Sequence, residues 1–105
     1  MTERQLEEIE VKRVTFELER KEAIESANVM VDVQGNVPFH ATSYARNMLM
    51  AKILVMDTPT IKYITLYGKE IDLTKEEAKT VLKAIVARQD FFWAEYFSRV
   101  KALYE

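Results

Sequence analysis

The 105-residue chain has no cysteine, two prolines, two glycines and a single histidine. The lack of cysteine excludes disulfides and thiolate metal sites, and two isolated glycines, Gly35 and Gly68, cannot build a glycine-rich phosphate loop. No apolar run approaches the roughly 18 residues of a membrane-spanning helix. The first four residues, Met1-Thr2-Glu3-Arg4, do not begin a signal peptide. We therefore expect a soluble protein that acts in a cytoplasm or in a particle assembled there.

The composition is that of one ordinary globular domain, with 49% hydrophobic and 30% charged residues and a formal net charge of −2. The charge is unevenly spread. Residues 1–28 hold eight acidic and five basic side chains, whereas residues 29–105 hold nine acidic and ten basic. We predict that residues 1–28 form a charged helix and candidate oligomerisation arm, and that residues 29–105 form a compact α+β domain.

The last third of the chain, Thr74 to Tyr104, predicts one long helix without glycine or proline. Thr74 and Glu77 have the Thr-x-x-Glu spacing of a capping box, which satisfies backbone N–H groups at a helix start. Such a helix exceeds the size of a compact 105-residue domain. We expect its far end to overhang and to be covered by the N-terminal segment or another subunit. One wide arc, interrupted only by Gln89, holds its apolar side chains: Ala78, Val81, Leu82, Ile85, Val86, Phe92, Trp93, Tyr96, Phe97, Val100, Leu103 and Tyr104.

The N-terminal stretch favours helix by composition, but its apolar residues fall into two separate stripes, which indicates contacts on two sides. Alternation in Val14-Thr15-Phe16-Glu17-Leu18 leaves a short strand as the alternative. One stripe contains Leu6, Ile9, Phe16, Ala23, Ile24 and Ala27, and the other contains Val11, Val14 and Leu18.

The middle of the chain predicts two β-hairpins separated by a helix. Val29 to Val33 and Val37 to Phe39 flank a turn at Gln34-Gly35-Asn36, and Pro38 places its strand at an edge. A helix capped by Thr42 or Ser43 should run to about Met56 and be covered on more than one face. We expect Met48, Met50 and Met56 to fill the core, and the alternative is an adaptable interface. The strand 61–67 and its return 71–73 form the second hairpin. The predicted class is α+β: N-terminal helix, hairpin, helix, hairpin and long C-terminal helix, with a small, mostly antiparallel sheet packed by helices.

The segment from Val29 to Ser43, followed by Arg46-Asn47-Met48, resembles a domain of unknown function of tailed-bacteriophage structural proteins, often found in tail-fibre and tail-associated chains. Downstream, Ile71-Asp72-Leu73-Thr74-Lys75-Glu76-Glu77 is similar to that family's start of the last helix. The resemblance covers about residues 12–104. It implies a role in the virion or in tail assembly, within a virion or the host bacterial cytoplasm. It supplies no catalytic residues.

Catalytic chemistry is not indicated by the sequence. A dyad of His40 and Asp32 acting on Ser43 can be drawn, but nothing in the sequence fixes the geometry that a general base requires. Glu76 and Glu77 are explained by the positive end of a helix dipole. No cluster has metal-ligand spacing. We predict no enzyme activity, no cofactor and no metal.

Contact surfaces are the more informative feature. Lysines at i, i+4 and i+8 (Lys75, Lys79, Lys83), with Lys62 and Lys69, form either a solvated helix face or a nucleic-acid surface. Phe91 points away from the main arc of the long helix and is a candidate intersubunit residue. We expect a structural protein of a tailed-phage particle that acts by protein–protein packing with itself or other tail proteins, and the alternatives are a tail-fibre assembly chaperone and a small nucleic-acid-binding regulator. The predicted interface residues are Leu6, Ile9, Phe16, Phe91, Tyr96 and Tyr104.

Overall fold

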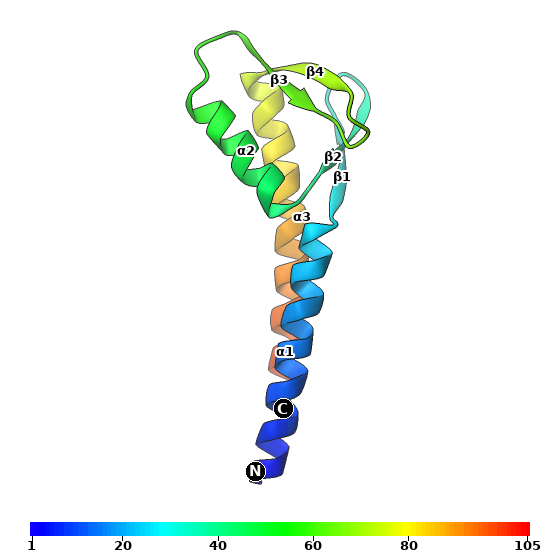
Figure 1. Ribbon diagram of the computed structural model, residues 1–105, viewed down its shortest axis with the longest axis vertical. Coiled ribbons are helices and arrows are strands. Elements are labelled where there is room, and N and C mark those ends of the chain that lie inside the picture. Colours follow the sequence, from blue (N-terminus) through cyan, green and yellow to red (C-terminus); the bar gives the residue numbers. More distant parts are fainter.

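A computed structural model, which describes all 105 residues, shows a head on a two-helix stalk (Figure 1). Helix α1 (Glu3–Glu25) leads through hairpin β1 (Asn28–Asp32) and β2 (Asn36–His40) to α2 (Ser43–Leu54). Hairpin β3 (Thr60–Ile64) and β4 (Glu70–Thr74) then leads directly into α3 (Lys75–Ala102). The predicted α+β order of helix, hairpin, helix, hairpin and long helix is therefore confirmed.

The molecule is elongated because α1 runs along the second half of α3, outside the head. Its principal extents are 61 × 24 × 19 Å, and its radius of gyration is 17.9 Å, against about 13 Å for a compact domain of this length. Helix α3 belongs to both parts, since its first half lies in the head and its second half in the stalk. No helix has the length and apolar content that a membrane span requires.

Both stalk helices begin with a capping box. Thr74 accepts a hydrogen bond from the Glu77 amide, and the Glu77 side chain accepts one from the Thr74 amide. Thr2 and Gln5 make the same reciprocal pair at the start of α1. These pairs satisfy amides that have no partner inside the helix. The residues from Val14 to Leu18 are helical, so the alternative of a short strand there is wrong.

The first hairpin turns through two residues in left-handed backbone conformation, Gln34 (φ 62°) and Gly35 (φ 93°). Gly35 adopts this conformation without a steric cost. Gln34 is held in it by its side-chain amide, which donates to the Asp72 carbonyl at 2.6 Å and also reaches the Glu77 carboxylate. The turn of the first hairpin is thereby fastened to the junction between β4 and α3.

The second hairpin is shorter than its sequence pattern predicts, because β3 ends at Ile64 and not at Tyr67. The next residue, Thr65, is buried, and its hydroxyl accepts the Lys69 amide at 3.1 Å inside the turn. The Leu66 amide leaves the hairpin and donates to the Pro38 carbonyl of β2 at 2.9 Å. Two two-stranded antiparallel sheets result, and this bond links them.

Helix α2 differs from its prediction in two respects. It ends at Leu54, with Val55 as its C-cap, so it does not reach Met56. Only one side packs on the head, through Ala45 and Leu49, and Met48 and Met50 are exposed. The prediction that Met48 and Met50 fill the core is wrong, because the two small hairpins supply too little surface to cover a second side of α2.

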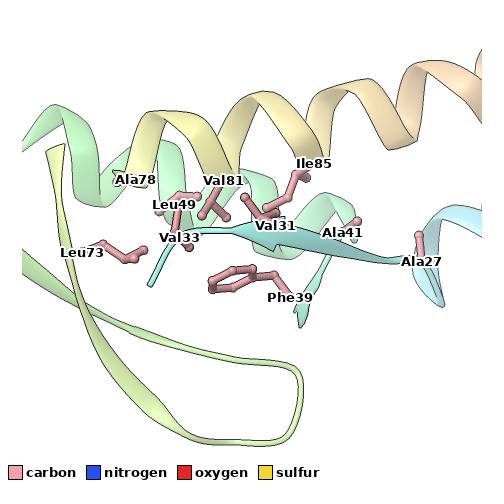
Figure 2. Close-up of a cluster of buried hydrophobic side chains, with 10 residues drawn as sticks. All are labelled: Ala27, Val31, Val33, Phe39, Ala41, Leu49, Leu73, Ala78, Val81 and Ile85. Carbon is pink, nitrogen blue, oxygen red and sulfur yellow. The ribbon is translucent and has the colours of Figure 1, made fainter. Parts of the chain in front are cut away.

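The core lies between the first half of α3, α2 and the two hairpins (Figure 2). Phe39, Leu49 and Leu73 are fully buried against α3. Gln89 closes the core at the boundary between head and stalk, and its side chain is buried. Its amide donates to the Ala41 carbonyl at 3.1 Å, and its carbonyl accepts from Arg46 at 3.4 Å. The predicted arc of α3 is therefore correct in the head, where it includes Ala78, Val81 and Ile85.

Candidate interaction surfaces

Beyond Gln89, no residue of α3 is fully buried, although this half of the helix is rich in aromatic side chains. Trp93, Tyr96 and Phe97 form a contiguous cluster. The Trp93 and Phe97 rings stack with centroids 5.5 Å apart, and Tyr96 lies 5.5 Å from Phe97 and 6.0 Å from Trp93. Tyr96 is half-buried against α1, whereas Trp93 and Phe97 are exposed. The stalk therefore leaves large apolar rings in solvent.

Arg20 of α1 covers one part of this cluster. Its guanidinium carbon lies 3.7 Å from the centre of the Trp93 ring and 5.2 Å from that of Tyr96. The Arg20 side chain is 10% exposed and has only a long ion pair with Glu17 at 3.9 Å, and its Nε has no hydrogen-bond partner. Stacking on aromatic rings is a common way to accommodate a weakly hydrated guanidinium. On the helical wheel, Arg20 falls within the apolar stripe that contains Phe16 and Ala23, and periodicity alone does not predict its contact with Trp93.

The two sides of the stalk differ in chemistry. On α3, Glu95 and Phe97 flank Tyr96, each about 100° around the helix in opposite directions. Glu95 lines a groove of 240 Å³ together with Phe16, Glu19 and Arg99. Arg99 pairs with Glu19 at 2.6 Å and stacks on Phe16 at 3.9 Å. We call this the polar side.

The opposite side carries Phe97, Trp93 at i−4 on the same helix, and Tyr104 in the turn that follows the end of α3 at Ala102. All three are exposed. On α1, Leu6 lies seven residues before Arg13 and fourteen before Arg20, so it continues the stripe that meets these rings. We call Leu6, Trp93, Phe97 and Tyr104 the aromatic side.

The six interface residues predicted from the sequence fall into three places. Ile9, Phe16 and Tyr96 are half-buried between α1 and α3. Leu6 and Tyr104 are exposed on the aromatic side. Phe91 is also exposed, near the junction with the head, where it makes an edge contact with Phe92 at 5.6 Å and lies 5.6 Å from the Arg88 guanidinium. The structure therefore does not gather all six into one surface.

The head contains one larger groove, of 480 Å³, between the start of α2 and β3. Tyr44, Met48 and Tyr63 form its apolar wall, and His40, Lys52 and Lys62 lie at its rim. The Tyr63 hydroxyl donates to the Ala45 carbonyl at 3.3 Å. Burial raises the pKa of Tyr63, and the neighbouring Tyr44 adds to the effect. This tyrosine holds its proton and serves as a hydrogen-bond donor.

The lysines do not form one free basic surface. Lys62 pairs with Glu70 at 3.1 Å and with Asp72 at 3.7 Å across the second hairpin. The hydrogen bond to Glu70 is the main reason that the pKa of Lys62 is raised. Lys79 lies 3.9 Å from Glu76 on α3. Lys75 and Lys83 remain exposed beside them.

The residues of the conceivable catalytic dyad are not brought together. His40 pairs with Asn28 at one end of the first hairpin, whereas Asp32 pairs with Asn36 at the other. Four residues of extended strand separate the two ends by roughly 13 Å, which excludes a hydrogen bond between His40 and Asp32. No three His, Asp or Glu side chains are grouped in a way that could hold a metal ion.

Comparisons with protein-family models, with curated proteins and with solved structures gave no match for this chain.

Proposed function

We propose that this protein is a structural interaction protein that works by packing its stalk against partner protein, in the setting of a tailed-bacteriophage particle. The observation that carries the proposal is the exposure of Trp93, Phe97 and Tyr104 along the stalk. The largest apolar patch on a protein surface is often a site of protein contact. The setting rests on the resemblance of residues 12–104 to a domain of phage tail proteins.

The shape supports the same function. The head holds the first half of α3, and the second half extends away from it in the stalk (Figure 1). The aromatic residues Trp93, Tyr96 and Phe97 belong to this second half. Contact residues on a helix are positioned more firmly than residues on a loop. The stalk can therefore present its rings to a partner without rearrangement of the head.

Mass spectrometry of purified phage particles, made in a host that produces this chain, tests the setting. We expect the chain among the particle proteins at a stoichiometry fixed from preparation to preparation. A chain that is absent from particles, but that co-purifies with tail-fibre protein from infected cells, is an assembly chaperone. Absence from both would overturn the phage setting.

Incorporation of stalk variants into phage particles tests whether the protein works by packing. Replacing both Trp93 and Phe97 with Ser should abolish incorporation into particles, while the matched replacement of exposed Met48 and Met50 on α2 should not.

A mobility-shift titration with DNA at low salt addresses the nucleic-acid alternative. Because Lys62 and Lys79 already face carboxylates, we expect no salt-sensitive shift.

A further inference from the structure

We infer that the aromatic side of the stalk binds a second copy of this chain and forms a four-helix bundle with both heads at the same end. This inference deepens the proposed function by naming the first partner of the stalk. It rests on three observations: the amount of exposed apolar surface, the excess of acidic side chains on α1, and the different chemistry of the two sides of the stalk.

The exposed apolar surface matches the need of a homodimer. Phe97 is 59% exposed and Tyr104 58%, so with Trp93 and Leu6 the aromatic side exposes on the order of 400 Å² of large apolar side chain. A standard interface takes about 800 Å² from each partner, a little more than half of it apolar. The aromatic side has the size of one half of such an interface.

Two antiparallel helices have a covered seam and two open sides, so each helix still lacks neighbours. The polar side is occupied by the pairing of Arg99 with Glu19 and by the stacking of Arg99 on Phe16. On the aromatic side, Arg13 pairs with Glu10, and Arg20 stacks on Trp93 and Tyr96. These contacts leave Phe97 59% exposed and Tyr104 58% exposed. Pairing two aromatic sides produces four helices around one apolar centre, as in a four-helix bundle.

Symmetry leaves two ways to place the second copy on this side. A two-fold axis along the stalk puts α1 of one copy against α3 of the other, with both heads at one end. A two-fold axis across the stalk puts α1 against the second α1, with the heads at opposite ends. Both arrangements are self-complementary, as a two-fold interface requires.

Charge selects the first arrangement. Helix α1 carries eight acidic and five basic side chains, whereas the part of α3 that lies in the stalk, residues 90–102, carries two acidic and two basic. Glu3, Glu10 and Glu17 recur at intervals of seven, on the opposite side of α1 from Glu19, and therefore border the aromatic side. Placing α1 on the second α1 would bring these glutamates together. Placing it on α3 avoids this repulsion and sets one of the glutamates beside Lys101, four residues after Phe97.

Light scattering on purified protein tests the dimer. We expect twice the chain mass, and we expect Phe97→Ser to weaken self-association at least tenfold with unchanged helical circular dichroism, since Phe97 is exposed within one chain. The matched control is Phe91→Ser. Phe91 is 56% exposed but lies off the aromatic side, so this variant should remain dimeric. A wild-type chain that is monomeric even at the highest concentration of a 100-fold dilution series would overturn the assignment. So would a dimer that is lost in the Phe91 variant and kept in the Phe97 variant.

Cysteine cross-linking tests the arrangement, because the natural chain has no cysteine. Tyr104→Cys places one thiol just after the end of α3 in the stalk, where a short bis-maleimide should join two copies when both heads are at one end. The control Glu8→Cys lies near the same end of the stalk beside Ile9 and Leu103, away from the aromatic side, and should not cross-link. Cross-linking at Glu8, or none at Tyr104 in a dimeric sample, contradicts the arrangement.

The two proposals fail separately. A monomeric chain that is nevertheless found in phage particles would overturn the dimer and leave the proposed function in place. A dimer that is absent from particles and from tail-fibre complexes would overturn the proposed function and leave the dimer in place.

Discussion

Gln89 shows how one polar side chain ends the head and begins the stalk. It is 3% exposed on a helix whose other buried residues are apolar, and it supplies the hydrogen bond to the buried Ala41 carbonyl. A buried acceptor without a donor costs about 1–3 kcal/mol. The Gln89 side chain is therefore required for stability at this boundary. In the sequence it is visible only as a polar residue that interrupts the apolar arc of α3.

Replacing Gln89 with Leu should lower the free energy of unfolding by about 1–3 kcal/mol, because the Ala41 carbonyl loses its donor inside the core. Urea denaturation followed by circular dichroism measures this change. Arg46→Ala is the control. Arg46 is exposed and its bond to Gln89 is long at 3.4 Å, so its loss should cost less than Gln89→Leu. Equal stability of Gln89→Leu and the wild type would contradict this account.

Glu77 makes the stability of the α3 start depend on pH. The Thr74 amide donates to its carboxylate and, with a smaller contribution from Gln34, lowers the pKa of Glu77 below the usual 4.5. A lowered folded-state pKa gives stability that is present above pH 4.5 and is lost as the pH falls through the folded-state pKa. Glu77→Gln keeps a capping box, as Gln5 does in α1, but cannot titrate.

The Glu77→Gln variant should therefore lose less stability than the wild type between pH 5 and pH 3, while the two should differ by less than about 1 kcal/mol at pH 7. Thermal unfolding across this pH range measures the difference. Identical acid sensitivity in the two proteins would show that the Thr74–Glu77 pair does not contribute to the pH dependence.

At the scale of elements, sequence patterns predicted the order and type of every helix and hairpin. They succeeded where local chemistry decides, as at Thr74, whose capping box fixes the start of α3. They failed where a distant residue decides. Strand β3 stops at Ile64 because Thr65 caps its own turn and Leu66 bonds to Pro38, and no local pattern contains that contact.

The candidate site was predictable only in part. The excess of aromatic side chains after Gln89 is visible in the sequence, and so is the exposure expected of Phe91. The division of the stalk into a polar and an aromatic side is not, because it depends on which face of α3 meets α1. Arg20 illustrates the difficulty. An arginine within an apolar stripe becomes intelligible only when Trp93 lies 3.7 Å away.

The head and the far part of the stalk should differ in local stability. Amides of residues 78–89 lie over the core, whereas those of residues 5–16 in α1 lie on a helix with no fully buried side chain in that range. At low protein concentration, hydrogen exchange followed by mass spectrometry should be at least tenfold faster in residues 5–16. Equal protection of both segments in monomeric protein would contradict the division into a stable head and a weaker stalk.

For the whole molecule, the proposed dimer should be wider than one chain but hardly longer. One chain is 61 Å long and 24 Å wide. A bundle with both heads at one end keeps close to this length, whereas heads at opposite ends would add the length of a second head. Small-angle X-ray scattering distinguishes the two. A maximum dimension well above that of one chain, in a sample shown to be dimeric, would exclude the proposed arrangement.

Pro38 limits the ways in which this protein can assemble. Each hairpin has only two strands, so each strand has one edge to which a foreign strand could add. At Pro38 that edge has no N–H to offer, and the carbonyl is already bonded to Leu66. The outer edge of β2 is thus closed to templated strand addition and to the fibrillar growth that follows from it. The closed edge of β2 agrees with the proposal that this protein assembles through the helices of its stalk.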